Sequence, residues 1–129
     1  MFRLMVTGSR TWSDSEAIVA ELQFIAKKYK NVVLVSGHAI GADRLAEEVA
    51  VGFGWVVEIH EPDWSLGDSA GYKRNSTMLD TGIDAVLAFH KDKSKGTADA
   101  IRKAKDRKVH TRIIEETTPA WLVEWAVKA

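Results

Sequence analysis

The sequence contains five short apolar segments, separated by longer stretches in which apolar residues recur with the spacing of an amphipathic helix. Each apolar segment is nearly continuous rather than alternating, and this pattern is typical of a strand buried on both faces of a sheet. Strands that alternate with helices predict right-handed βαβ units and a parallel sheet covered on both sides. The predicted strands are residues 2–7, 32–36, 56–60, 85–89 and 109–114.

The stretches between the strands predict four helices, and a fifth helix follows the last strand. Ser13 and Glu16 form an S-x-x-E capping box, which predicts the start of the first helix. Thr118 and Pro119 have the character of an N-cap and a first helical residue, and they predict a short helix at about residues 119–127. We therefore expect one α/β domain over residues 1–129. Its fold would be three-layer and Rossmann-like, with a five-stranded parallel sheet in the order 3-2-1-4-5.

The composition excludes several classes of protein. The chain has no cysteine, which removes disulfides, thiolate zinc sites and thiol nucleophiles. No segment approaches the ~20 apolar residues of a membrane span, and the N-terminus lacks a signal-peptide pattern. The four histidines do not have the spacing of metal ligands. We expect a soluble cytoplasmic protein with no membrane partner, no metal and no cofactor.

The charges are balanced in number but not in position. The chain has 18 basic and 18 acidic residues, yet residues 91–112 contain nine basic residues against three acidic ones. A basic segment of this kind indicates either a phosphate-rich partner or the solvated face of a helix.

Glycine-rich and polar segments follow the first four predicted strands, at the sheet edge where such folds bind ligands. Glycine lets backbone N–H groups approach an anion closely, and the N-terminus of the following helix adds partial positive charge. These loops predict a site for a phosphate-bearing ligand. The candidate residues are Gly8, Ser9, Arg10, Ser36, Gly37, Gly41, Ala42, Asp43, Gly96 and Thr97.

Four side chains outside the glycines have predicted roles. Arg10 and Arg74 present planar forks that suit phosphate and could clamp one group between them. Asp43 either caps the second helix or contacts a ligand hydroxyl. Trp64 either stacks on a base or packs as part of a lid or the core. No G-x-G-x-x-G or G-x-x-x-x-G-K-[ST] motif is present, so ordinary NAD and ATP enzymology is disfavoured.

Together the loops resemble the SLOG superfamily, a Rossmann-like group that includes LOG phosphoribohydrolases and DprA-type DNA-processing proteins. The likeness is greatest to its small YspA-like branch, found in bacteria and their phages. The resemblance implies a nucleotide pocket at the sheet edge identified above. It adds Asp63, Asn75 and Met78 to the candidate ligand-binding residues. If the gene is phage-encoded, it also implies that the protein is located in the host cytoplasm. The matching segments are V-T-G-S-R at 6–10, V-S-G-H-A-I-G-A-D at 35–43, D-W at 63–64, A-G-Y-K-R-N-S-T-M at 70–78 and S-K-G-T at 94–97.

The resemblance leaves three functions open. The first is a domain that binds a nucleotide or nucleotide derivative as a sensor, sequestering protein or carrier. The second is a hydrolase that cleaves the N-glycosidic bond of nucleoside 5′-monophosphates, with Arg74 on the phosphate and Asp43 or Asp99 as the acid. Ala100 occupies the position of the LOG glutamate. The third is single-stranded DNA binding in the manner of DprA, through residues 91–112 and Trp64.

The predicted C-terminal helix bears on assembly. Its apolar residues form one stripe, which would either dock on its own domain or pair with another copy. LOG-like relatives commonly pair, so the resemblance implies a homo-oligomer, most simply a dimer. The stripe consists of Trp121, Leu122, Trp125 and Ala126.

Overall fold

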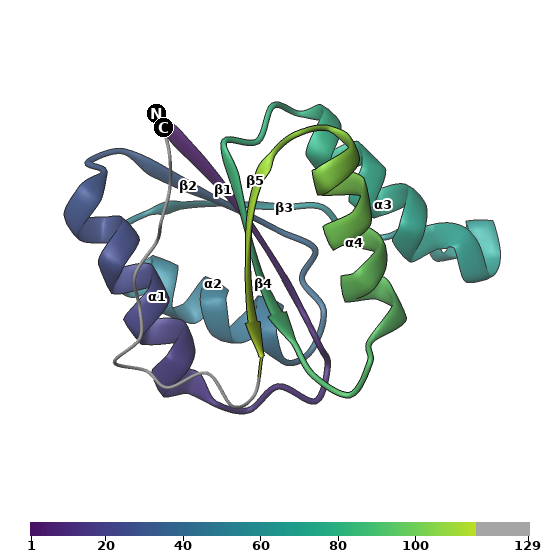
Figure 1. Cartoon of the computed structure of the whole chain (residues 1–129), viewed down its shortest axis with the longest axis horizontal. Coiled ribbons are helices and arrows are strands. Elements are labelled where there is room, and N and C mark those ends of the chain that lie inside the picture. Colours follow the sequence, from purple (N-terminus) through teal and green to yellow (C-terminus); the bar gives the residue numbers. More distant parts are fainter. Residues whose placement is uncertain (116–129) are drawn as a thin grey trace.

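The computed structural model describes residues 1–115, which form a five-stranded sheet with helices on both faces (Figure 1). All neighbouring strands are parallel and their order is β3-β2-β1-β4-β5, so the predicted topology is confirmed. No helix in this part of the chain is long and apolar enough to cross a membrane. The predicted helix at 119–127 lies outside the described residues. The strands are β1 (Phe2–Gly8), β2 (Val32–Ser36), β3 (Val56–Ile59), β4 (Ala85–His90) and β5 (His110–Glu115).

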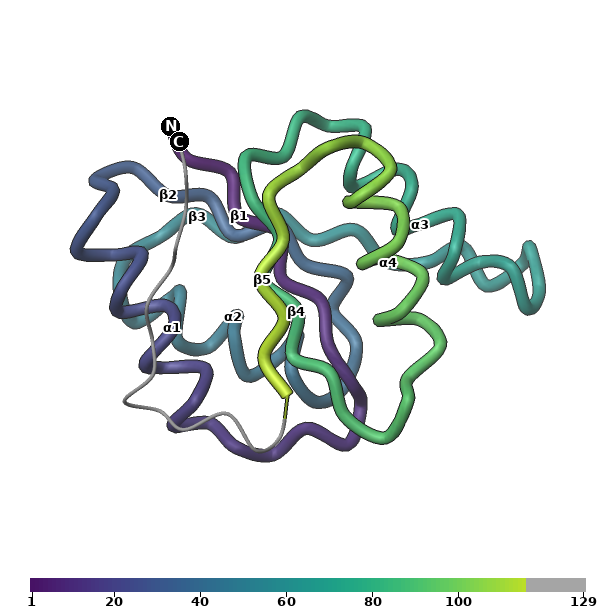
Figure 2. The backbone as a smooth tube through the Cα atoms, in the orientation of Figure 1, coloured from purple at the N-terminus to yellow at the C-terminus, as the bar shows by residue number. Residues whose placement is uncertain are grey.

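Two helix pairs cover opposite faces of the sheet. Helix α1 (Ser15–Lys28) packs against α2 (Ala42–Gly52) on one face, and α3 (Ala70–Asp80) packs against α4 (Lys95–Asp106) on the other (Figures 1 and 2). A short 3-10 helix, η1 (Trp64–Ser69), precedes α3.

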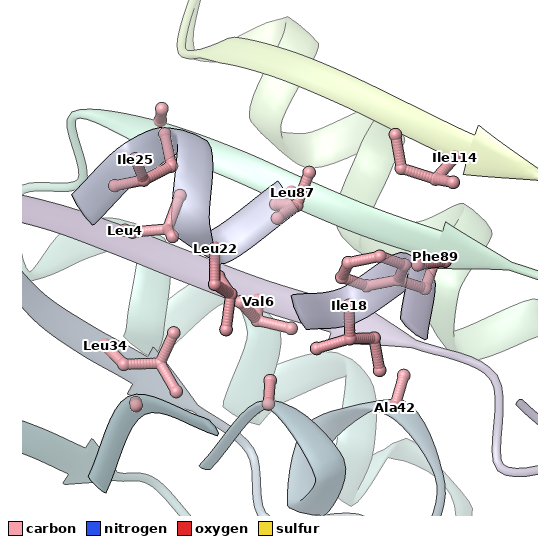
Figure 3. Close-up of a cluster of buried hydrophobic side chains, with 14 of the residues drawn as sticks. Leu4, Val6, Ile18, Leu22, Ile25, Leu34, Ala42, Leu87, Phe89 and Ile114 are labelled. Atoms are coloured by element: carbon pink, nitrogen blue, oxygen red, sulfur yellow. The ribbon is translucent and has the colours of Figure 1, made fainter. Parts of the chain in front are cut away.

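The double coverage explains why the central strands β1, β2 and β4 are mostly apolar, whereas the edge strands β3 and β5 are partly exposed and carry polar residues. Successive side chains of a strand point to opposite faces. In β1, Leu4 and Val6 therefore enter the core beneath α1 and α2, whereas Met5 enters the core beneath α3 and α4. Figure 3 shows the first of these cores, where Ile18 and Leu22 of α1 meet the strand residues.

Helix α1 begins one residue later than the capping box predicts. Its N-cap is Asp14, whose Oδ1 accepts a hydrogen bond from the Ala17 N–H at 3.2 Å. The Trp12 indole Nε1–H donates to the Asp14 carbonyl at 2.9 Å, and this bond fixes the turn that presents Asp14 to the helix. The predicted Ser13 cap is therefore wrong, because the buried Trp12 sets the direction in which the chain enters α1.

The carboxyl end of β1 lies unusually close to the start of α2. A Cβ atom built on Gly8 would overlap the Ala42 Cβ and lie 2.9 Å from the Phe89 carbonyl oxygen. Ala42 is fully buried and Phe89 belongs to β4, the neighbour of β1. Gly8 therefore allows two strands and a helix N-terminus to meet at one edge of the sheet.

We expect Gly8→Ala to lower the free energy of unfolding by roughly 1–3 kcal/mol, because the added methyl group overpacks this junction. Gly52→Ala is the matched control, since Gly52 is exposed and a Cβ there meets nothing within 4 Å. Urea unfolding followed by circular dichroism measures both changes. An equal effect of the two substitutions would show that the junction tolerates the methyl group.

Candidate ligand-binding site

A pocket with a volume of about 530 Å³ opens at the carboxyl edge of the sheet, where the loops after β1, β2, β3 and β4 converge. This edge includes the point between β1 and β4 where the strand order reverses, the usual ligand site of such sheets. Much of the predicted site is brought together here. The predicted residues that line the pocket are Gly8, Arg10, Gly37, Asp43, Trp64, Arg74, Asn75, Gly96 and Thr97.

The first loop is held by Ser9, which is buried and does not line the pocket. Its Oγ donates to the Lys91 carbonyl at 2.6 Å and accepts from the Lys91 N–H at 2.7 Å. Its own carbonyl accepts from the Ala42 N–H at 3.3 Å. Ser9 thus joins three loops and leaves the next residue, Arg10, exposed on the pocket wall.

The second loop depends on two glycines. Gly41 has φ +92°, and a Cβ there would lie 2.5 Å from the carbonyl oxygens of Ser9 and Arg10. A Cβ on Gly37 would overlap the Arg74 guanidinium. Both positions therefore exclude a side chain, because the loop packs directly against the first loop and against α3.

Arg74 is anchored within the pocket but keeps part of its guanidinium free. Its Nη1 donates to the Gly37 carbonyl at 2.7 Å and its Nε donates to Asn75 Oδ1 at 3.1 Å. Its Nη2 has no hydrogen-bond partner among residues 1–115. Burial lowers the pKa of Arg74, the nearby Asp43 raises it, and the charge of Arg10 lowers it. Arg10 itself forms no hydrogen bond or ion pair within the described chain.

Asp43 is a buried carboxyl with one unsatisfied oxygen. Its Oδ2 accepts from the Ala39 N–H at 3.1 Å, so the side chain braces the loop and does not cap α2, whose N-cap is Gly41. Its Oδ1 is buried and has no partner among the described residues. Burial raises the pKa of Asp43 to about 7, although the Ala39 N–H and Arg74 both act to lower it.

His38 lines the pocket, although sequence reasoning did not select it. Its Nδ1 lies 2.7 Å from Glu47 Oε1, and Glu47 Oε2 accepts from the Ser36 hydroxyl at 2.7 Å. The Ser36 hydroxyl also accepts from the His38 N–H at 3.2 Å, in a loop where His38 adopts φ +61°. Ser36 therefore supports the wall from behind instead of lining it.

The outer rim of the pocket is aromatic and apolar. Trp64 is 62% exposed and Ile40 is 66% exposed, and both line the pocket together with Tyr72. Trp64 begins η1, which projects from the body of the molecule (Figure 2). Asp63 caps this helix by accepting from the Ser65 N–H at 3.1 Å, and it does not line the pocket.

The other predicted residues lie behind the pocket wall. Met78 is buried in the core beneath α3 and α4, and Ala42 is buried against Gly8. Asp99 accepts from Asn75 Nδ2 at 3.1 Å and pairs with Arg102 and Lys103 of its own helix. Arg74 and Asp43, two of the three candidate catalytic residues, therefore line the pocket, whereas Asp99 contacts it through Asn75.

Several pocket residues were not among the residues selected from the sequence. His38, Ala39 and Ile40 belong to the glycine loop that sequence reasoning singled out, so a reading of the whole loop would have included them. Glu61 closely follows β3 and Tyr72 lies in the 70–78 segment of the family resemblance, whereas Asp68 meets the pocket through the path of η1. No group of three metal-ligating side chains is found within residues 1–115. The additional lining residues are Thr7, His38, Ala39, Ile40, Arg44, Glu61, Pro62, Asp68, Gly71 and Tyr72.

The raised pKa of Asp43 makes the stability of the fold depend on pH. An unfolded chain ionises this carboxyl near pH 4, whereas the folded chain holds the proton until about pH 7. The free energy of unfolding should therefore fall as pH rises from 4 to 7 and then level off. The Asp43→Asn variant has no carboxyl to ionise at this position, so its free energy of unfolding should not fall in this way. We expect its stability relative to the native protein to increase by roughly 2–4 kcal/mol between pH 4 and pH 8.

Urea unfolding of both proteins at pH 4, 6 and 8 measures this difference. Asp14→Asn is the control for a carboxyl that caps a helix at the surface. A stability difference between Asp43→Asn and the native protein that stays constant with pH would contradict the assignment.

Comparison with known proteins identifies relatives of this site and fold. Residues 2–67 match the model of the "YspA, cpYpsA-related SLOG family". The Gene 61 protein of Mycobacterium phage D29 is 37% identical over 114 residues, which cover 81% of this chain and 89% of that protein. The family match includes the first two loops of the pocket.

Two solved structures of DNA processing protein A (DprA) share the fold. The protein from Streptococcus pneumoniae aligns over 88% of this chain with a TM-score of 0.68 and 17% identity. The protein from Helicobacter pylori, which binds single-stranded DNA, aligns over 87% with a TM-score of 0.63 and 19% identity. This chain spans 50% and 64% of the length of those two chains. The family match and the phage relative together establish that the chain belongs to the YspA, cpYpsA-related SLOG family.

Proposed function

We propose that the protein binds a nucleotide or nucleotide-derived ligand, whose phosphate lies between Arg10 and Arg74. The observation that supports this most directly is the presence of two incompletely paired guanidinium groups on one pocket. The charge of Arg10 acts on the pKa of Arg74, so the two cations are close enough to repel each other. An anion between them relieves this repulsion, and arginine forks match phosphate oxygens in geometry.

The N-terminus of α4 supplies a third source of positive potential. Gly96 and Thr97, in the first turn of α4, line the pocket. Asn75 Nδ2 donates to the Gly96 carbonyl at 3.1 Å, which holds this turn beside Arg74. Backbone N–H groups at a helix N-terminus bind anions, and the helix dipole favours negative charge there.

The rim of the pocket suits the base of a nucleotide. Trp64 is exposed at the mouth, and an indole ring stacks on planar bases. Binding is better supported than cleavage of the N-glycosidic bond. The position of the LOG glutamate is Ala100, which carries no acid, and Asp99 is paired with Arg102 and Lys103. Asp43, the other candidate acid, lines the pocket but braces the loop through the Ala39 N–H. We therefore favour a sensor, sequestering or carrier role.

Single-stranded DNA binding is the second candidate, because the fold resembles DprA and α4 is basic. Several of the basic side chains are, however, neutralised within the fold: Arg102 and Lys103 by Asp99, Arg107 by Asp80 and Arg112 by Glu21. These pairs reduce the charge available to a phosphate backbone, so the pocket remains the stronger candidate site.

We expect the native protein to bind nucleoside monophosphates more tightly than the matching nucleosides in isothermal titration calorimetry. Arg10→Ala should weaken monophosphate binding by ~1.5–3 kcal/mol and leave nucleoside binding unchanged, because it removes a charged donor without disturbing a bond of the fold. Lys105→Ala, an exposed change on α4, is the control and should alter neither affinity.

Two results would contradict this proposal. The first is no binding of any nucleoside monophosphate at millimolar concentration. The second is tight binding of an oligonucleotide that weakens steeply with added salt and depends on Lys105 more than on Arg10, which would identify nucleic-acid binding instead.

We also expect self-association. Apolar side chains are exposed around β3, an edge strand of the sheet, where Val51, Phe53, Val56 and Ile59 are between 37% and 68% exposed. Edge strands with exposed apolar residues favour pairing with another chain. Light scattering should give a mass above that of one chain at micromolar concentration, and Val56→Lys should lower it. A monomer mass over the whole concentration range would contradict the expectation.

A further inference from the structure

One side of the pocket presents hydrogen-bond acceptors that no donor within residues 1–115 satisfies. We call it the acceptor wall, and it consists of Asp43 Oδ1, His38 Nε2 and the Glu61 carboxylate. It faces the same pocket as Arg10 and Arg74, whose guanidinium groups donate hydrogen bonds. The ligand therefore needs two chemically different ends, an anion for the arginines and a group of donors for the acceptor wall.

Asp43 is the most demanding member of the acceptor wall. Only 4% of Asp43 is exposed, and its Oδ1 has no hydrogen-bond partner in the described chain. A buried acceptor without a hydrogen bond destabilises the fold by about 1–3 kcal/mol. Such a group persists at a binding site when a ligand supplies the missing donor, and Asp43 lines the pocket.

The Nε2 atom of His38 is an acceptor because the Glu47 carboxylate lies on the other side of the ring. When the imidazole carries a single proton, the Glu47 carboxylate 2.7 Å from Nδ1 holds that proton on Nδ1, because a carboxylate only accepts. Nε2 then offers a lone pair to the pocket. Glu61 Oε1 lies 4.0 Å from Nε2, which is too far for a hydrogen bond.

We propose that the acceptor wall binds the vicinal hydroxyls of a ribose, so that the protein selects ribonucleotides over 2′-deoxyribonucleotides. This inference rests on the proposed function, since it requires the phosphate to bind at Arg10 and Arg74. Asp43 and His38 are the specificity-determining residues. Glu47 is a positioning residue, because it acts through the His38 ring.

The position of the acceptor wall favours the sugar over the base. Arg74 donates to the carbonyl of Gly37, the residue directly before His38, and its charge acts on Asp43. The wall is therefore next to the phosphate site. In a nucleoside 5′-phosphate the ribose hydroxyls lie between the phosphate and the base, whereas the base would extend toward the exposed rim at Trp64.

The experiment compares pairs of ligands that differ by one hydroxyl. The affinities of AMP, GMP, CMP and UMP are measured by calorimetry against those of their 2′-deoxy counterparts at pH 8, above the pKa of about 7 of Asp43, so that this carboxyl is ionised and accepts through Oδ1. We expect each ribonucleotide to bind roughly tenfold more tightly, since one hydrogen bond to a charged acceptor is lost in the deoxy ligand. AMP against inosine monophosphate tests the other donor, the exocyclic amine of the base.

Variants locate the discrimination within the pocket. Asp43→Asn and His38→Asn should each reduce the ribose preference several-fold and leave 2′-deoxynucleotide binding nearly unchanged. Asparagine suits both positions, because it tolerates the positive φ of His38 and keeps the shape of Asp43. Glu47→Gln should reduce the preference less, since its amide oxygen still accepts from Nδ1. Arg10→Ala should weaken both members of each pair equally and leave the preference intact.

The outcomes separate this inference from the proposed function. Equal affinity for the ribose and deoxyribose members overturns the inference and leaves nucleotide binding standing. A preference that follows the exocyclic amine instead of the sugar also overturns it. Failure of every nucleotide to bind overturns both. A ribose preference that persists in Asp43→Asn and in His38→Asn would place the recognition elsewhere.

Discussion

Ser9 accepts and donates hydrogen bonds that join three segments at the carboxyl end of β1. Its hydroxyl bonds to the backbone of Lys91 after β4, and its carbonyl accepts from the N–H of Ala42 at the start of α2. This arrangement requires Gly8 and Gly41 beside it, because a Cβ at either position would collide with the neighbouring backbone. The pocket exists because these close approaches hold its loops in place.

The pocket contains both positively charged arginines and a buried carboxyl group within one small volume. Arg10 and Arg74 concentrate positive charge, whereas Asp43 is buried so deeply that its pKa rises to about 7. The low dielectric that weakens the ionised form of Asp43 also strengthens any hydrogen bond made there. Both features are common where a fold is arranged for a ligand and not for its own stability.

The relationship to known proteins defines the architecture more firmly than the activity. The chain shares its sheet and helices with DprA at under 20% identity, and one fold supports many functions. The features of this chain that bear on its activity lie in the pocket. Here Asp99 is paired within α4, and Glu47 holds His38, which directly follows the Gly37 carbonyl that accepts from Arg74.

The sequence by itself determined the strands, their order and the sheet edge that bears the site. Strands buried on both faces are apolar throughout, and the handedness of βαβ units leaves few topologies. It also selected Gly8, Gly37 and Gly41, although it assigned them to anion binding, and the structure shows that they pack the loops together. Only the tertiary structure decided which polar side chains face the ligand. Hydrophobic periodicity assigns a face to a residue but does not state its hydrogen-bond partners. Ser9 and Asp99 are therefore satisfied within the fold, whereas His38 and Glu61 reach the pocket, because the loops meet in three dimensions.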